Sequence, residues 1–241
     1  MLTIKNNISC LIPAAGKGKR AGLDYPKTLF KLNSLPILIR ILKSLHEIDA
    51  NPSVVINKKY NDMFIKILNK YNFQAELLFQ KRQIGMGNSI LQFNKSYKKF
   101  KNNHILLIWG DIPFIRKTTI KKLINLHFKN NNDFSLITKL VDNPYTIVTR
   151  DKNNKILSIK ETKINKDLKC KYGERDIGIF LFKHNLVMNF LKKKLPDKYL
   201  NGEHGFLYIV EHLISSGYKV EGYPIANNKE IISFNSLNDL K

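Results

Sequence analysis

The sequence is poor in acidic residues, in cysteine and in long hydrophobic runs. Against 41 lysines and arginines it has only 19 aspartates and glutamates, so its formal net charge is +22. Its two cysteines, Cys10 and Cys170, are far apart and lack zinc-type spacing, which argues against a disulfide scaffold or a zinc site. No run reaches the ~18 apolar residues that a membrane span needs. We therefore expect a globular protein of a reducing compartment, the cytoplasm.

The excess of basic residues has two interpretations. A basic surface could bind nucleic acid. Only six of the basic residues are arginine, however, and the lysines are scattered along the chain without a helix-turn-helix, zinc-finger or RNP-like pattern. We therefore expect no specific nucleic-acid partner, but a positive electrostatic field that attracts anionic substrates.

Short β-type runs alternate with helical patterns along the first 140 residues. The first run, residues 8–13, leads into a glycine-rich basic loop, which is typical of a core strand and not of a signal peptide. Further strands are predicted at 53–56, 75–79, 104–109 and 133–140, and helices at 36–48, 61–71, 87–93 and 118–128. Such alternation predicts an α/β fold with a mainly parallel, doubly wound central sheet.

The pattern after residue 140 is less regular and richer in β-type runs. A hairpin is predicted between strands at 145–150 and 155–160. Further strands are predicted at 177–182, 219–223 and 231–234, and helices at 186–193 and 205–215. Because no repeat or long linker interrupts the chain, we expect residues 1–241 to form a single domain.

A glycine-rich basic loop, residues 14–20, follows the first predicted strand. Its small residues let backbone N–H groups approach an anion closely, and such a loop binds phosphate in many α/β folds. A Walker A motif is absent. Gly16, Gly18 and Ala21 nominally meet a dinucleotide fingerprint, but the second strand does not end in the acidic residue that this motif needs. The loop therefore predicts a phosphate site of another kind.

The segment after this loop makes the pattern more specific. Pro26 presets a turn, which holds Lys27 close to the glycine loop. The order Ala14-Ala15-Gly16-x-Gly18-x-Arg20, followed by Pro26-Lys27, resembles the L-A-A-G-x-G-x-R…P-K-x-L pattern of the sugar-phosphate nucleotidyltransferases, which are MobA-like NTP transferases. The resemblance implies a Rossmann-like, three-layer nucleotidyltransferase (GT-A-like) fold with a small β-rich part that binds the acceptor.

The resemblance also implies roles for individual residues of both segments. Catalytic roles are implied for Arg20 and Lys27, because Lys27 would neutralise the charge that grows on the phosphates during transfer. Phosphoryl transfer depends mainly on such positioning and charge stabilisation. Nucleotide binding is implied for Ala14, Ala15, Gly16, Gly18, Arg20 and Lys27.

An aspartate, Asp111, follows the strongly apolar run 104–109. Ligands of open α/β sheets bind at the carboxyl ends of the strands, where this carboxylate would lie. Mg²⁺ takes one or two protein oxygens and leaves its other positions to phosphates and water. Asp111 is therefore predicted to bind Mg²⁺, and the resemblance implies a second metal ligand, Asn235, near the end of the domain.

Residues 80–88 follow the third predicted strand and look like the Q-x-x-Q-x-G-T-G-x segment of the N-acetylglucosamine-1-phosphate uridylyltransferases. A glutamine amide offers a donor and an acceptor to a pyrimidine edge. The resemblance implies that Gln80 and Gly85 bind the uracil base. Met86 replaces the threonine of this pattern, so UTP and CTP both remain candidates.

The acceptor-binding residues are implied by looser matches in the second half of the chain. They are Thr146, where the family has a glycine, Glu161, and Asp176, where the family has an asparagine. Since a site with matched polar groups rejects other substrates strongly, these departures predict an acceptor other than N-acetylglucosamine 1-phosphate. The NTP-binding half would be residues 1–140, and the acceptor-binding half residues 141–241.

The predicted reaction is transfer of a nucleoside monophosphate from UTP or CTP to a sugar 1-phosphate or a similar phosphorylated acceptor, with release of pyrophosphate. No cluster of histidines along the sequence indicates a catalytic dyad. Two alternatives remain open. The chain could be a cytidylyltransferase for a non-sugar phosphate, because residues 12–16 are similar to the methylerythritol-phosphate cytidylyltransferases. It could also be a non-catalytic, basic α/β protein that binds nucleotide or nucleic acid.

Overall fold

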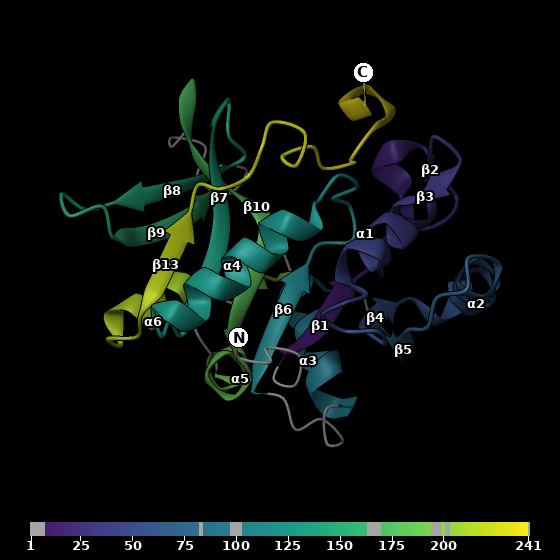
Figure 1. Ribbon diagram of the computed structural model, residues 1–241, viewed down its shortest axis with the longest axis horizontal. Coiled ribbons are helices and arrows are strands. Elements are labelled where there is room, and N and C mark those ends of the chain that lie inside the picture. The colour runs from purple at the N-terminus through teal and green to yellow at the C-terminus, as the bar shows by residue number, and fades with distance from the viewer. Residues whose placement is uncertain are drawn as a thin grey trace.

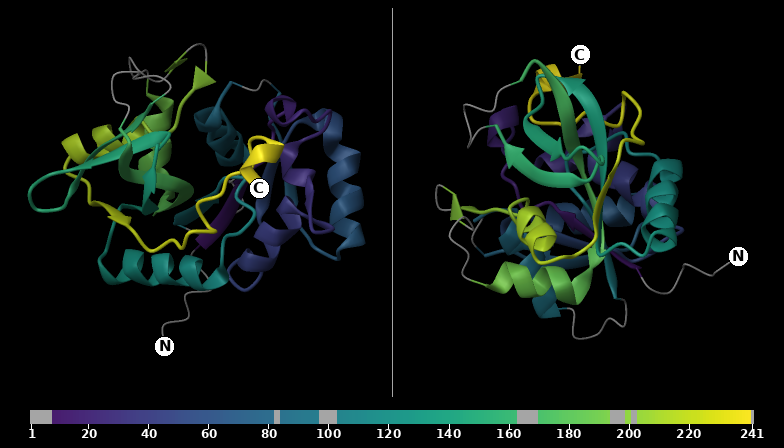
Figure 2. Two further views of the ribbon diagram at one scale, coloured as in Figure 1. Left: turned by 90° about the horizontal axis from the view of Figure 1, so that it is seen from above. Right: turned by 90° about the vertical axis from the view of Figure 1, so that its left-hand side faces the viewer.

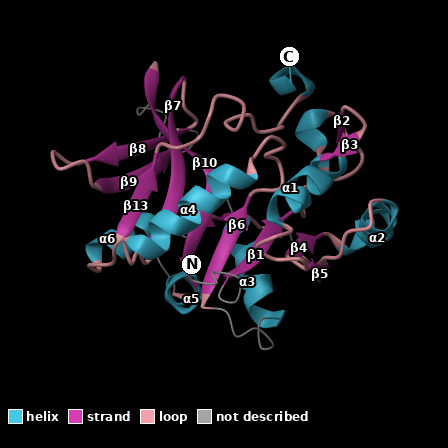
Figure 3. Ribbon diagram, viewed as in Figure 1, coloured by secondary structure: helices cyan, strands magenta, loops and turns pink. Residues whose placement is uncertain are grey.

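A central sheet of seven strands runs through the molecule, with helices on both sides (Figures 1 and 3). The computed structural model describes residues 8–81, 84–96, 103–162, 170–193, 199–200 and 203–240. In spatial order the strands are β13 (Val220–Tyr223), β7 (Phe134–Asp142), β10 (Tyr172–Lys183), β6 (His104–Ile108), β1 (Ile8–Pro13), β4 (Ser53–Ile56) and β5 (Glu76–Phe79). Only β10 runs antiparallel to its neighbours in this sheet. The predicted α/β fold with a mainly parallel, doubly wound sheet is confirmed.

Two hydrophobic cores lie on opposite faces of this sheet. Along β1, Cys10 and Ile12 belong to one core and Leu11 belongs to the other, because successive side chains of a strand point to opposite faces. The first core is covered by α1 (Ile37–Leu45), α2 (Asn61–Lys70) and α4 (Lys117–Lys129). The second core is covered by α3 (Met86–Ser96), α5 (His184–Lys192) and α6 (Ile209–Ser215). The three-layer arrangement that the family resemblance implies is therefore present.

The hairpin of β8 (Thr146–Arg150) and β9 (Ile156–Glu161) forms a sheet of its own, as predicted. It projects from the body of the molecule in two perpendicular views (Figures 1 and 2). Three apolar residues anchor its base in the second core: Val148, Ile156 and Ile159. Two short pairs were not predicted, β2 (Lys31–Leu32) with β3 (Leu35–Pro36) and β11 (Tyr199–Leu200) with β12 (Glu203–His204). Strands of two residues carry too little periodicity to be recognised.

The strand predicted at 231–234 is wrong, because this segment forms turns and loop. Phe234 is fully buried and stacks on Phe30, with 4.5 Å between the ring centroids. Its backbone N–H donates to the carbonyl of Asp111 at 2.7 Å. The apolar residues of this segment therefore pack at the carboxyl edge of the sheet and do not pair as a strand. Of the part of the chain that the structure describes, no helix is long and apolar enough to cross a membrane.

Candidate active site

A cavity of about 650 Å³ opens at the carboxyl edge of the central sheet. It lies where β1 and β6 end side by side, since these two strands are parallel neighbours. The residues after β1, β5 and β6 line it, together with the β8–β9 hairpin, the segment His204–Leu207 and the chain near Asn235. Segments from both halves of the sequence therefore meet at the place where open α/β sheets bind ligands.

The glycine-rich loop after β1 contributes Ala14, Ala15 and Gly16 to the wall of the cavity. Gly18 does not line it. This residue has a left-handed backbone (φ 72°), and a Cβ at this position would lie 2.3 Å from the carbonyl oxygen of Tyr25. Gly18 thus lets the loop pack against the turn that leads to Lys27. The backbone of Arg20 belongs to a short 3-10 helix, but its side chain lies outside the described residues.

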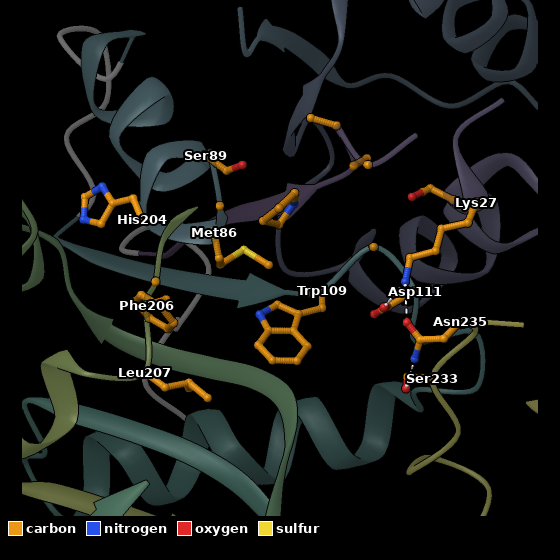
Figure 4. Close-up of a pocket in the computed structure, with 18 of the residues that line it drawn as sticks. Lys27, Met86, Ser89, Trp109, Asp111, His204, Phe206, Leu207, Ser233 and Asn235 are labelled. Atoms are coloured by element: carbon orange, nitrogen blue, oxygen red, sulfur yellow. Dashed lines mark hydrogen bonds and ion pairs between the residues drawn. The ribbon is translucent and has the colours of Figure 1, made fainter. Parts of the chain in front are cut away.

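Three predicted residues meet at one end of the cavity. The ammonium of Lys27 donates to Asp111 Oδ2 at 2.5 Å and to Asn235 Oδ1 at 3.0 Å (Figure 4). The side chains of Lys27 and Asp111 are only 19% and 14% exposed. The structure therefore brings together side chains that are 84 and 208 positions apart in the sequence.

This end of the cavity has the donor set that a hard cation requires. Asp111 Oδ1 is buried and accepts no hydrogen bond from any residue that the structure describes, so this oxygen is available to bind a cation. Asn235 presents an amide oxygen beside it, and the ammonium already held between the two shows that the position attracts positive charge. No group of three histidine, cysteine, aspartate or glutamate side chains that could hold a metal occurs among the described residues. Mg²⁺ does not need one, because phosphates and water complete its octahedron.

Backbone contacts hold Asn235 in place. The bond from Phe234 N–H to the Asp111 carbonyl ties the two segments together next to the site. The carboxylate of Asp239 then accepts from the backbone N–H groups of Asn235 and Ser236, at 2.7 and 2.6 Å. The Asn235 amide donates to Ser233 Oγ at 3.1 Å, which leaves its oxygen facing Lys27.

Gln80 and Gly85, the predicted base-binding residues, both line the cavity. Gln80 is only 3% exposed. Both the nitrogen and the oxygen of its side-chain amide form hydrogen bonds to other protein groups. Ser89 Oγ donates to Gln80 Oε1 at 2.9 Å from the first turn of α3. The structure thus places Gln80 at the predicted wall but joins its amide to the neighbouring loop.

On the acceptor side, Thr146 and Glu161 line the cavity and face each other as partners of the β8–β9 hairpin. Asp176 does not line it and is fully buried. Its carboxylate accepts from Thr146 Oγ1 at 2.6 Å and from Gly178 N–H at 2.8 Å. Burial raises the pKa of the Asp176 carboxyl above its ordinary value. The structure therefore places Asp176 behind Thr146, where it orients the threonine hydroxyl.

Sequence reasoning missed Trp109, which stands in the middle of the cavity wall. Its indole separates the Lys27 end from the apolar end formed by Met86, Phe206 and Leu207 (Figure 4). The indole Nε1 is buried and has no hydrogen-bond partner among the described parts of the chain. Its position directly after a central buried strand was a usable signal, because that is the edge where ligands bind.

The cavity wall includes two further residues that the sequence analysis did not assign to the site, Tyr145 and His204. Burial raises the pKa of the Tyr145 phenol, helped by the nearby negative charge of Asp176. The guanidinium of Arg175 lies 3.5 Å from the centre of the Tyr145 ring, so the ring is held from behind. His204 is 1% exposed and reaches the cavity from β12, a strand too short to be predicted.

The fold and this cavity define a doubly wound α/β protein with a nucleotide-sized site at the carboxyl edge of its sheet. Residues 10–163 match the MobA-like NTP transferase domain. The chain belongs to the MobA-like NTP transferase family, as its phosphate loop and Pro26-Lys27 pair predicted.

Curated relatives extend this similarity over nearly the whole chain. The bifunctional protein GlmU of Buchnera aphidicola subsp. Baizongia pistaciae is 31% identical over 235 residues, which cover 96% of this chain and 50% of that protein. The bifunctional protein GlmU of Thermodesulfovibrio yellowstonii is 30% identical over 233 residues, which cover 95% and 50%. The chain therefore spans about half the length of these curated relatives.

Solved structures confirm the nucleotidyltransferase fold. The inositol-1-phosphate CTP transferase from T. maritima superposes with a TM-score of 0.74 at 17% identity, over 98% of this chain and 92% of that one. A putative glucose-1-phosphate thymidylyltransferase from Bacillus anthracis gives a TM-score of 0.77 at 17% identity, over 97% and 92%. At this identity the likeness concerns the fold and not the substrate.

Proposed function

We propose that this protein is a nucleotidyltransferase that transfers a nucleoside monophosphate from UTP or CTP to a sugar 1-phosphate or a similar phosphorylated acceptor, with release of pyrophosphate. One observation supports this above all others. Lys27, Asp111 and Asn235 meet at the end of the cavity where the glycine-rich loop opens. A cation, a carboxylate and a backbone phosphate cradle at one place suit a metal-bound triphosphate.

The chemistry needs positioning and charge more than it needs a base. An acceptor phosphate oxygen attacks the α-phosphorus, a new P–O bond forms, and the bond to the β-phosphate oxygen breaks as pyrophosphate leaves. The acceptor phosphate is already ionised near neutral pH, so no side chain has to remove a proton. Lys27 would move from Asp111 and Asn235 to the phosphates and neutralise the charge that develops there.

The metal in this proposal is Mg²⁺, held by Asp111 and Asn235. When bound, it neutralises phosphate charge and orients the reacting groups. The residues of the glycine-rich loop would have the roles that the sequence predicted. Ala14, Ala15 and Gly16 would bind the triphosphate. Arg20 would add a second positive charge to that loop, while Gly18 would act by shaping it.

The two halves of the cavity would serve the two substrates. Residues 1–140 would supply the NTP site, and residues 141–241 most of the acceptor site, with Thr146 and Glu161 in contact with the acceptor and Asp176 orienting Thr146. Two of the structural neighbours are named for action on inositol 1-phosphate and glucose 1-phosphate, which supports a small phosphorylated polyol or sugar. We propose that the reaction takes place in the cytoplasm.

Pyrophosphate release tests the proposal. The purified protein with Mg²⁺ would be assayed against each of the four NTPs combined with a panel of sugar 1-phosphates and polyol phosphates. Turnover with one pyrimidine NTP and one phosphorylated acceptor is expected, and removal of the metal by EDTA should abolish it. Asp111→Ala should lose this turnover. If the protein binds NTPs but releases pyrophosphate in no combination, the proposed activity is wrong.

A further inference from the structure

Two segments that are far apart in the sequence carry the proposed metal ligands. Asp111 lies between β6 and α4, and Asn235 lies in the chain that follows β13 (Figure 4). A cation held by so few protein oxygens depends on the distance between them, because Mg²⁺ demands near-ideal octahedral geometry. We propose that Glu230 is a positioning residue that fixes this distance by joining the two segments outside the cavity wall. The inference rests on the proposed function and deepens it, since it concerns the metal of the same site.

Glu230 is fully buried, and its carboxylate accepts hydrogen bonds from both segments. Its Oε1 accepts from the backbone N–H of Arg116 at 2.9 Å, and its Oε2 accepts from the backbone N–H of Asn227 at 2.9 Å. The Arg116 guanidinium adds a longer contact to Oε2, at 3.3 Å. One buried carboxylate therefore spans the segment of Asp111 and the segment of Asn235.

On the side of Asp111, the carboxylate lies at the start of a helix. Arg116 is the N-cap residue of α4, and its own side chain makes no cap hydrogen bond. The Glu230 carboxylate takes that place, where the positive end of the helix dipole stabilises a negative charge. Asp111 belongs to the same short connection between β6 and α4, so Glu230 fixes the end of the connection that carries the first ligand.

On the side of Asn235, Glu230 closes a turn of its own segment. The Asn227 amide oxygen accepts from the backbone N–H groups of Lys229 and Glu230, both at 3.0 Å. Because Glu230 in turn accepts from the backbone N–H of Asn227, the two residues form a capping box. This turn comes shortly before Asn235, so it fixes the path of the chain that leads to the second ligand.

A second contact joins the two segments next to the ligands themselves. The backbone N–H of Phe234 donates to the carbonyl of Asp111 at 2.7 Å. Together with the bond from Arg116 to Glu230, this contact joins the segments at two points, which sets both their spacing and their orientation. Glu230, Arg116 and Asn227 do not line the cavity, so they act on the metal through the positions of its ligands.

Isothermal titration calorimetry of UTP and CTP, in Mg²⁺ and in EDTA, tests the inference. For each variant, the ratio of the Kd in EDTA to the Kd in Mg²⁺ measures the contribution of the metal to nucleotide binding. In Glu230→Gln one carboxylate oxygen becomes an NH₂ group that faces a backbone N–H, so one of the two bonds is lost. We expect the ratio to fall by about tenfold, as is typical for a residue that orients a metal ligand, with the Kd in EDTA unchanged within about twofold. Glu47→Gln makes the same chemical change at an exposed position and should keep the wild-type ratio.

A second pair of variants keeps the test decisive if Glu230→Gln folds poorly. Asn227→Ala removes the side-chain acceptor of the turn and should lower the ratio in the same direction. Asn227→Ser keeps an oxygen that can cap the turn and should restore most of the ratio. A residue that only stabilises the fold would lower the Tm without changing the ratio, so thermal unfolding of the same variants separates the two roles.

A double variant tests whether Glu230 acts through Asn235. Asn235→Ala should itself lower the ratio, because a proposed ligand is lost. Adding Glu230→Gln to Asn235→Ala should then lower the ratio no further, since there is no longer a second ligand to position.

The outcomes separate the inference from the proposed function. Wild-type ratios in both Glu230→Gln and Asn227→Ala would overturn the inference and leave the proposed function standing. Effects of Glu230→Gln and Asn235→Ala that multiply in the double variant would overturn it as well. If the wild-type protein binds neither pyrimidine NTP, or binds them equally well in EDTA, the proposed metal-dependent function fails first and the inference falls with it.

Discussion

The Lys27 ammonium contacts the Asp111 carboxylate at 2.5 Å, although the two residues are 84 positions apart in the sequence. Both side chains are largely shielded from solvent, so removal of either partner would leave the other charge partly buried and uncompensated. The same ammonium reaches Asn235 at 3.0 Å. The pair thus links the turn after the phosphate loop, the end of β6 and the segment near the chain's end.

Replacement of Lys27 by methionine should lower kcat by about 10²–10³-fold, because a preorganised positive charge at the phosphates is lost. The pyrophosphate-release assay measures this effect at saturating NTP. Lys117→Met is the matched control, because Lys117 pairs with Glu47 on the exposed surface and should leave kcat unchanged. A Lys27→Met enzyme with wild-type kcat would remove Lys27 from the catalytic residues.

Trp109 is the single tryptophan of the chain, and its indole lies in the cavity wall. Its Nε1 is buried and finds no partner within the described ranges, so a ligand in the cavity should change its surroundings. We expect the intrinsic fluorescence to shift in wavelength or intensity on titration with Mg²⁺ and UTP or CTP, or with the acceptor. Trp109→Phe should abolish the signal. A spectrum that stays constant at a ligand concentration that saturates binding by calorimetry would place the ligand away from Trp109.

Asp176→Asn should make the protein relatively more stable as the pH rises. Because burial raises the native pKa of Asp176, the wild-type fold holds this proton more tightly than the unfolded chain does. Wild-type stability is therefore lost as the pH rises from about 4, the unfolded pKa, through the native pKa. Thermal unfolding between pH 4 and 8 should show the difference in Tm between variant and wild type growing with pH. Asp142→Asn, which makes the same chemical change at an exposed position, is the control.

The structure brings His104 and His127 together, with 5.1 Å between their ring centroids, although no histidine cluster is visible along the sequence. Burial, together with the positive charges of His104 and Lys183, lowers the pKa of His127 to about 3. His127 Nδ1 lies 2.8 Å from Ser135 Oγ, and no residue of the described structure hydrogen-bonds to its Nε2. The folded protein therefore keeps this ring neutral at a pH where the unfolded chain is protonated.

The resulting prediction concerns acid stability. As the pH falls from about 6.5 towards 3, His127 should reduce the free energy of unfolding by up to about 1.4 kcal/mol per pH unit. Urea unfolding at a series of pH values measures this slope, and His127→Gln should flatten it. His46→Gln is the control, because His46 is exposed. An unchanged slope in His127→Gln would assign the acid sensitivity to other groups.

Local patterns predicted much of the fold. The bounds of β1 and β4 were predicted to the residue, because buried apolar runs between glycine-rich or polar segments are typical of central strands. The placement of Ala14, Gly16, Lys27 and Asp111 at one edge also followed, because parallel strands end at the same edge of a sheet. These features depend on neighbours within a few residues or on a general rule of topology.

Other features depended on contacts that no local pattern carries. Residues 231–234 were predicted to form a strand, but they form turns and loop, and Phe234 stacks on Phe30. Asp176 was predicted to bind the acceptor, but in the folded protein β10 pairs with β7 and Asp176 is buried behind Thr146. A side chain's burial depends on what packs over it from elsewhere in the chain, and periodicity does not record that.

The sequence by itself determined the class of fold, the family and the position of the glycine-rich loop, Lys27 and Asp111 at one edge of the sheet, since each depends on short motifs and on strand order. Only the tertiary structure decided that the Gln80 amide is joined to Asn88 and Ser89, that Trp109 stands in the cavity wall, and that His204 reaches the cavity from β12. The physical reason is that hydrogen bonds and close packing form between groups brought together by the closing of the whole chain, whereas a motif specifies only its own few residues.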